Sequence, residues 1–240
     1  METLFAPAEK ADTQELAAEI ETVSQNPVVS GLLHSIGGLL AVLDEHRQVI
    51  ALNHSFLEML GIQDASQALG LRLGEALECV HAHDVPGHTC GSTRYCSTCG
   101  AAIAIMTSLD QDEVAERICA LTARKGGRPI ELALLVRSQP IRLGGKRFLL
   151  VFLQDITKQQ QRAALERTFF HDINNMLCML SGASELLERE HPSEWAEMVC
   201  QTSARLMKEV AIQQCLSQND EQSYQPLWSN VTTGQIRKEL

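Results

Sequence analysis

Three residues with complementary chemistry stand close together in this 240-residue chain: His171, Asp172 and Asn175. An imidazole nitrogen can act as a nucleophile, and a neighbouring carboxylate can accept a hydrogen bond from the other ring nitrogen and so fix its tautomer. A carboxamide does not transfer protons at neutral pH, but it can orient a water molecule. These residue types could supply a nucleophile at His171, an acid–base partner at Asp172 and an orienting amide at Asn175, although an exposed histidine is often only a solvated helix residue.

The helix that must position these residues has an apolar stripe. Its members follow one another at spacings of 4, 3, 4, 3 and 4 residues, the heptad pattern of a helix packed in a bundle: Phe169, Ile173, Met176, Leu180, Ala183 and Leu187. His171 lies two residues from Phe169 and two from Ile173, roughly 200° of helical rotation from each. His171 should therefore point away from the packed side, with Asn175 directly over it one turn later.

A second candidate site is a group of four cysteines within 21 residues: Cys79, Cys90, Cys96 and Cys99. The spacing of Cys96 and Cys99 lets two thiolates reach one metal ion, and two more cysteines at loop distances complete a four-sulfur ligand set. Such a set suits an iron–sulfur cluster, which would sense oxygen or redox state, or a tetrahedral zinc ion, which would brace the loop. A dithiol switch between Cys96 and Cys99, or inert thiols, are the remaining alternatives.

The other cysteines are predicted to have no chemical role. Cys119 lies in a strand pattern and is expected to pack as a small hydrophobe. Three more lie on two long predicted helices, where buried thiols are common: Cys178, Cys200 and Cys215. The histidines near the cysteine group are interpreted as supporting or surface groups rather than ligands: His81, His83 and His88.

Composition and charge limit the possible partners and location. A net charge of -10 argues against nucleic acid or an anionic membrane as the main partner. Residues 1–10 lack a basic start followed by an apolar run, so no signal peptide is expected. The most apolar stretches, Gly31–Leu43 and Phe148–Leu153, are too short or too interrupted to span a bilayer. A cytoplasmic protein is expected, with its eight cysteines reduced, metal-bound or redox-active.

The elements before the histidine-bearing helix are predicted to form an antiparallel sheet. Short apolar or alternating segments bounded by turn residues predict five strands: Gly38–Leu43, Gln48–Leu52, Glu113–Thr122, Pro129–Arg137 and Lys146–Gln154. Short helices are expected over Ser55–Leu60 and Ala101–Leu109. After Thr157 the pattern is helical to about Glu190, and a second helix with its own apolar stripe follows from about Ser193 to Leu216.

The sheet region resembles a PAS sensor domain. The resemblance rests on two strands, the turn Asn53-His54-Ser55-Phe56 into a helix, the stop at Leu60-Gly61, and three closing strands. The ending Asp155-Ile156-Thr157 is similar to the Asp-Ile-Thr through which PAS domains hand over to an effector helix. By this resemblance, the cysteine group falls in the helical middle of the fold, where PAS domains hold their ligands.

The helical region resembles the phospho-acceptor region of sensor histidine kinases. The segment from His171 to Asn175, followed by a helical hairpin, is similar to the phospho-acceptor box in its variant with Asn-Asn after the acid. The resemblance implies that His171 accepts a phosphoryl group from ATP and passes it to the receiver domain of a response regulator. It also implies that Asn175 helps to hydrolyse the regulator's phosphoryl group, and that two chains pair through their hairpins.

A complete histidine kinase also has a domain that binds ATP and Mg²⁺. Its Asn-rich helix and Gly-rich boxes do not occur in this sequence, and only Leu227, Trp228 and Val231 resemble its first segment. We therefore expect the chain to be inactive alone and to need that ATP-binding domain as a partner. Either a truncated kinase or a natural stand-alone protein would have such a sequence.

The sequence thus predicts an α+β protein with a PAS-like antiparallel sheet and flanking helices, followed by a two-helix hairpin that dimerises into a four-helix bundle. The expected divisions are an N-terminal amphipathic helix at 1–27, a sensor domain at 28–157 with a cysteine-rich loop at 79–99, a phospho-acceptor hairpin at 158–217, and a linker at 218–240.

The predicted function is that of the signal-sensing part of a two-component histidine kinase. A redox, oxygen or metal signal at the cysteine group would control phosphorylation of His171. Two other classes remain open, a phosphorelay or scaffold protein without kinase activity, and a metal-binding PAS protein whose helices only dimerise.

Overall fold

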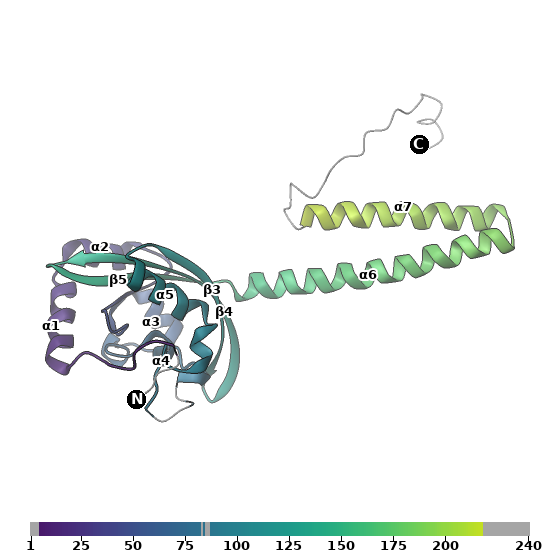
Figure 1. The fold of residues 1–240 in the computed structure, drawn as a ribbon. Coiled ribbons are helices and arrows are strands. Elements are labelled where there is room, and N and C mark those ends of the chain that lie inside the picture. Colours follow the sequence, from purple (N-terminus) through teal and green to yellow (C-terminus); the bar gives the residue numbers. More distant parts are fainter. Residues whose placement is uncertain (1–4, 83, 85–86, 218–240) are drawn as a thin grey trace. The chain divides into compact units, whose positions relative to one another are not determined.

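The computed structural model describes residues 5–82, 84 and 87–217. The chain divides into two compact units between Gln160 and Gln161. The first unit holds an antiparallel sheet with helices, and the second holds a pair of long helices (Figure 1). The segment expected to lead into an ATP-binding domain, with Leu227, Trp228 and Val231, lies outside the described residues, as does His83.

The sheet has five strands in the order β2-β1-β5-β4-β3, and every neighbouring pair is antiparallel. The strands are β1 (Leu39–Leu43), β2 (Val49–Leu52), β3 (Ala115–Lys125), β4 (Arg128–Leu143) and β5 (Lys146–Asp155). All five predicted strands are confirmed, although β4 runs six residues beyond Arg137 to the next turn. Both glycine pairs that end β3 and β4 have positive φ, which two-residue hairpin turns require.

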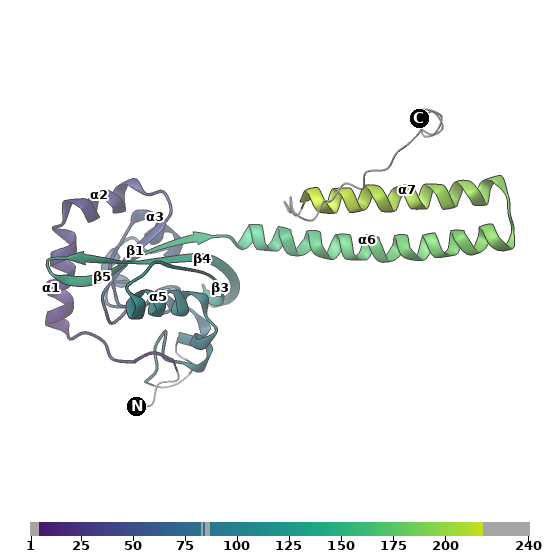
Figure 2. The same cartoon turned by 45° about the horizontal axis from the view of Figure 1, so that its top comes forward.

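One face of the sheet carries the main core and the helices α3 (His54–Leu60), α4 (Leu73–Ala76) and α5 (Gly100–Gln111). Figure 2 shows α5 beside β3 and β4. Asn53 fixes the start of α3, because its side-chain oxygen accepts hydrogen bonds from the Phe56 and Leu40 N–H groups. Its amide donates to the carbonyl oxygens of Ile36 and Gly38. Asn53 is therefore a turn residue that caps α3, and Phe56 is a core residue.

The opposite face is covered at one end by α1 (Thr13–Ser24) and α2 (Pro27–Ser35), whose apolar residues pack on β1, β2 and β5. Asp12 caps α1 by accepting hydrogen bonds from the Gln14 and Glu15 N–H groups. The helix α2 was not predicted, since the expected N-terminal helix ended at residue 27 and the next expected element was the strand from Gly38. Asn26 caps a second helix that Pro27 begins, because proline at the first helical position needs no partner for its nitrogen.

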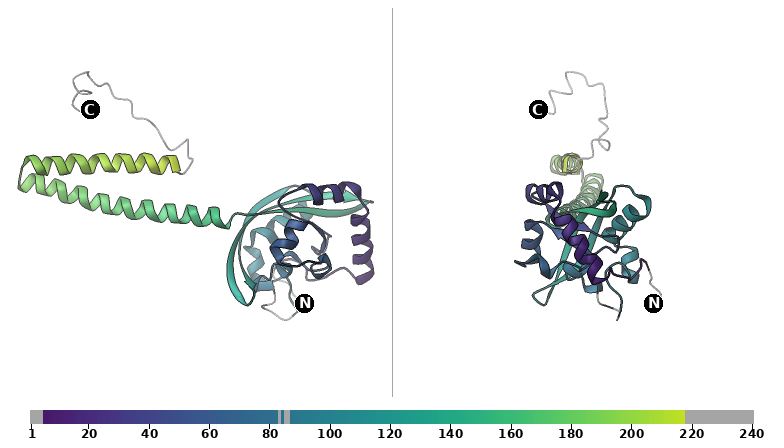
Figure 3. Two further views of the ribbon diagram at one scale, coloured as in Figure 1. Left: turned by 180° about the vertical axis from the view of Figure 1, so that it is seen from behind. Right: turned by 90° about the vertical axis from the view of Figure 1, so that its left-hand side faces the viewer.

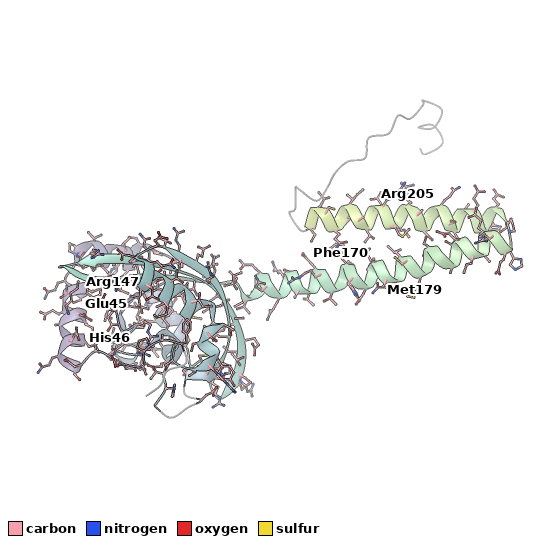
Figure 4. All side chains as sticks on the ribbon, in the orientation of Figure 1. Glu45, His46, Arg147, Phe170, Met179 and Arg205 are labelled. Atoms are coloured by element: carbon pink, nitrogen blue, oxygen red, sulfur yellow. The ribbon has the colours of Figure 1, made fainter. Side chains whose placement is uncertain are left out.

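The second unit is an antiparallel pair of helices, α6 (Thr157–Glu190) and α7 (Glu194–Ser217), joined through residues 191–193 and close to the predicted bounds (Figure 3). The buried residues are Phe170 and Ser184 on α6 and Ala196 and Ser203 on α7, and the Asn174 amide donates to the Gln214 side-chain oxygen across the pair at 3.2 Å. In Figure 4, Phe170 lies between the helices, while Met179 and Arg205 point away from the contact.

The apolar stripe predicted to pack α6 is not the side that contacts α7. Phe169, Met176, Leu180 and Leu187 are 58%, 56%, 44% and 47% exposed. The contacting residues lie one position later in the chain, about 100° further round the helix. Within a single chain the predicted stripe is therefore an open apolar face.

No helix among the described residues is both long enough and apolar enough to cross a membrane.

Candidate functional site

Five cysteines line one cavity of about 260 Å³ in the first unit. Four are the cysteines that the sequence grouped, Cys79, Cys90, Cys96 and Cys99, which the fold brings to a common space. The fifth is Cys119 on β3, which is fully buried in the core as predicted and also lines the cavity. Its position on the cavity-facing side of β3 depends on strand register, which the cysteine spacing does not reveal.

Two glycines let the chain close around these thiols. A Cβ atom at Gly74, in α4, would lie 2.6 Å from the sulfur of Cys90 and 3.5 Å from the Cβ atom of Cys79. Gly91 follows Cys90 with a φ of +91°, and a Cβ atom there would overlap the guanidinium of Arg47. Each position therefore needs glycine for close approach, and Gly91 also for its backbone conformation.

The thiols differ in their hydrogen bonding. The Cys96 sulfur lies 3.1 Å from the Gly91 nitrogen, which donates to it, and 3.2 Å from the Thr93 hydroxyl. The sulfurs of Cys99 and Cys119 lie 3.6 Å apart. Among the described residues, no group of three or more histidine, cysteine, aspartate or glutamate side chains is close enough to hold a metal ion as they stand.

The thiol environments shift their pKa values in different directions. Burial raises the pKa of Cys90 to about 12 and also raises that of Cys79. The pKa of Cys99 is lowered to about 6, chiefly by the hydrogen bond from Cys119 and, against burial, by the N–H groups at the start of α5. The same contact raises the pKa of Cys119. Of the paired thiols Cys99 and Cys119, Cys99 is thus the one that ionises more easily.

Two buried arginines, Arg47 and Arg72, form another part of the cavity wall. They are only 6% and 1% exposed, and in the described part of the chain neither forms an ion pair with a carboxylate. Burial lowers the pKa of Arg47 to about 10 and also lowers that of Arg72. Both remain cationic at neutral pH, and the Asp44 carboxylate acts on both without forming an ion pair, so the cavity wall is positively charged.

These arginines also hold the N-terminal strap, which we define as Phe5–Asp12. Arg72 donates to the carbonyl oxygens of Glu9 at 2.6 Å and Cys90 at 3.2 Å, and Arg47 donates to that of Pro7. The Ala6 N–H group donates to the carbonyl oxygen of Gly91 at 3.0 Å. The strap is therefore attached both to the arginines and to the cysteine loop.

His81 lines the same cavity and is held from two sides. Its Nδ1 atom lies 2.6 Å from the Asp84 carboxylate, and its ring stacks on Tyr95 with centroids 3.8 Å apart. These contacts fix the orientation of the imidazole ring at the cavity.

His171, Asp172 and Asn175 lie together on the exposed surface of α6. The Asp172 carboxylate is 3.1 Å from the His171 Nδ1 atom, and the Asn175 amide nitrogen is 3.4 and 3.5 Å from the two ring nitrogens. The side chains of His171 and Asp172 are 72% and 63% exposed. The imidazole is thus accessible, and its two predicted partners are within reach of it.

No protein-family model matches this chain, and no curated protein matches it. The solved structures that are similar include a PAS domain of an HTR-like protein from Haloarcula marismortui (19% identity, 60% of this chain, 99% of that chain, TM-score 0.37). They also include the PAS domain of nitrogen regulation protein NR(II) from Vibrio parahaemolyticus (19%, 55%, 100%, 0.37) and one from a two-component sensor histidine kinase (13%, 60%, 99%, 0.36). The strand order β2-β1-β5-β4-β3, with α3, α4 and α5 inserted between β2 and β3, gives the first unit a PAS-like α+β fold.

Proposed function

We propose that this chain is the sensing and phospho-acceptor part of a two-component histidine kinase. The observation that carries the proposal is the exposed grouping of His171, Asp172 and Asn175 on a helical hairpin that leaves an apolar face open. A signal received by the PAS-like unit would control phosphorylation of His171, and the phosphoryl group would pass to a response regulator.

The arrangement suits phosphoryl transfer. With a proton on Nδ1, held by Asp172, the Nε2 atom of His171 presents a lone pair. That atom forms a bond to the terminal phosphorus of ATP as the bond to ADP breaks, with ATP and Mg²⁺ supplied by a separate ATP-binding domain. Asn175 would orient the water that hydrolyses the phosphorylated regulator.

Pairing with a second copy of the chain would cover the open apolar face. On α6 and α7 alike, exposed stripe residues directly precede buried contact residues: Phe169 before Phe170, and Trp195 before Ala196. The same offset in two antiparallel helices places both stripes on one side of the hairpin, because the pair is related by a near-twofold axis. Two such faces would form a four-helix bundle, which is the arrangement that dimeric hairpins adopt.

For the sensing unit we propose an iron–sulfur cluster, or alternatively zinc, held by Cys79, Cys90, Cys96 and Cys99. Either group bound by four thiolates is anionic, and the buried charges of Arg47 and Arg72 would offset it. The N–H and hydroxyl groups beside Cys96 would support a thiolate there. To bind either group, the four sulfur atoms would have to move closer together than they are in this structure.

Transfer from radiolabelled ATP tests the kinase proposal. The full chain is mixed with a separately prepared histidine-kinase ATP-binding domain, and acid-labile label is measured on the wild type, His171→Ala and His191→Ala. Label on the wild type and on the His191→Ala control, but not on His171→Ala, is the expected result. A wild type that stays unlabelled, or a labelled His171→Ala, would contradict the proposal and favour a module that only dimerises.

Anaerobic purification with metal analysis and a visible absorption spectrum tests the cofactor. Iron and sulfide with broad visible absorption indicate a cluster, and colourless protein with stoichiometric zinc indicates the alternative. Cys96→Ser should lose the metal, whereas Cys178→Ser, an exposed thiol on α6, should keep it.

A further inference from the structure

Cys99 and Cys119 form a close thiol pair, although they are 20 residues apart in the sequence. Cys99 is the N-cap of α5 and is partly exposed, whereas Cys119 is fully buried in β3. The two sulfurs are 3.6 Å apart, and both residues line the cavity. This contact joins a helix to a strand, so it does not depend on the geometry of a loop.

The first residue of α5 explains why the two thiols meet. A Cβ atom at Gly100 would lie 2.1 Å from the carbonyl oxygen of Ile118, so only glycine lets the helix approach the backbone of β3 here. The neighbours of these two residues are Cys99 and Cys119. A disulfide needs a sulfur separation of about 2.05 Å, which means a further approach of about 1.5 Å, within the range of side-chain rotation.

Cys96 has different contacts from Cys99. Its sulfur meets the Gly91 nitrogen and the Thr93 hydroxyl, and not another thiol at this distance. The two-residue spacing of Cys96 and Cys99 suggests that these two would pair. The side-chain contacts instead favour Cys119 as the partner of Cys99.

We propose that Cys99 and Cys119 form a reversible disulfide when a peroxide enters the cavity. The Cys99 thiolate attacks one peroxide oxygen, the O–O bond breaks, and hydroxide leaves and takes up a proton as water. The Cys119 thiol then attacks the sulfur of the resulting sulfenic acid, and a second water leaves with its proton. The two thiols lose two electrons in total, which the peroxide gains, and an external thiol reverses the reaction by exchange.

This inference rests on the proposed redox role of the cavity and adds a resolving thiol to it. A metal held by Cys99 would block the reaction, so the disulfide belongs to the metal-free chain. Cys119 lies outside the proposed ligand set and becomes reactive only when Cys99 is released.

Peptide mapping of the metal-free full chain after hydrogen peroxide treatment provides the test. Trypsin places Cys96 and Cys99 in residues 95–117 and Cys119 alone in residues 118–124. The two peptides should be linked in the wild type and in Cys96→Ser, and unlinked in Cys99→Ser and Cys119→Ser, with linkage lost on reduction. Circular dichroism establishes that each variant is folded. A linkage that survives in Cys99→Ser, or no linkage in folded wild type, would overturn the proposal.

Metal content separates this inference from the proposed cofactor. Cys119→Ser should retain the metal of the wild type, since Cys119 is not assigned as a ligand. Loss of metal from folded Cys119→Ser would show that Cys119 is a ligand and would overturn its assignment as a resolving thiol. Disulfide formation in a chain that binds no metal would instead refute only the cofactor.

Discussion

The Arg72 guanidinium donates to the carbonyl oxygen of Glu9 at 2.6 Å and to that of Cys90 at 3.2 Å. One buried side chain thereby joins the N-terminal strap to the cysteine loop. Arg72 is among the largest fully buried side chains of the described chain. Its charge faces the thiols on one side and its hydrogen bonds hold the strap on the other, so the two are physically linked.

Replacing Arg72 should release the strap. Arg72→Gln removes the guanidinium and leaves the carbonyl oxygens of Glu9 and Cys90 without their donor. This loss should lower the unfolding free energy by about 2–4 kcal/mol. Trypsin cleavage after Lys10, whose ammonium group pairs with Glu75 at 2.8 Å, should become faster. Arg162→Gln, on the exposed side of α6, is the matched control and should cleave at the wild-type rate. Equal cleavage of both variants would refute this role for Arg72.

Asp44 should make stability depend on pH between about 4 and 6. Burial raises its pKa from 3.8 to about 6, so in that range the folded chain keeps a proton that the unfolded chain has lost. Unfolding free energy therefore falls as pH rises through this range. Relative to the wild type, Asp44→Asn should gain about 2–3 kcal/mol between pH 4 and pH 7, measured by urea denaturation.

Asp64 provides the contrast for this measurement. Hydrogen bonds from Ser66 lower its pKa, so its carboxylate form is favoured in the folded chain. Relative to the wild type, the unfolding free energy of Asp64→Asn should therefore fall as pH rises, which is the opposite of the change expected for Asp44→Asn. A wild type and Asp44→Asn with parallel profiles would contradict the assigned burial of the carboxylate.

The sequence predicted the strands and the spacing at His171 because both depend on local pattern. Alternation and glycine turns define the hairpins, and a four-residue separation places Asn175 over His171 in any helix. The approach of Cys119 to Cys99 depends instead on how α5 lies on β3, which no local pattern encodes. The burial of Arg47 and Arg72 also could not be predicted, because arginine is usually a surface residue.

The heptad pattern on α6 shows another limit of sequence interpretation. It identified an apolar stripe but could not say whether the neighbouring helix of the same chain or a second chain covers it. The contact with α7 uses Ser184 and Ser203, small polar residues whose hydroxyl groups bond to backbone carbonyls of their own helices. Such residues do not contribute to a hydrophobic pattern, so the actual contact was missed.

Gly100 and Gly182 are two helical glycines with opposite predicted responses to alanine. A Cβ atom at Gly100 would press on the backbone oxygen of Ile118, which cannot move without disturbing β3. Gly100→Ala should therefore cost about 2–3 kcal/mol of unfolding free energy. Nothing lies within 4 Å of a Cβ atom at Gly182, so Gly182→Ala should gain about 0.5–1 kcal/mol through helix propensity. Chemical denaturation of both variants measures this, and a neutral Gly100→Ala would refute the close approach.

Leu180 lies on the open stripe of α6, and a charge there should prevent pairing of two chains. In the proposed four-helix bundle each copy would bury the glutamate of Leu180→Glu without a partner, a cost of several kcal/mol. The dissociation constant of the dimer, measured by sedimentation equilibrium, should therefore rise at least about a hundredfold. The control is Lys208→Glu, an exposed charge reversal on α7 roughly 160° from the stripe residue Leu206, which should leave the mass unchanged. A monomeric wild type would show that the stripe does not pair two chains, and a Leu180→Glu variant that remains a dimer would show that another surface mediates pairing.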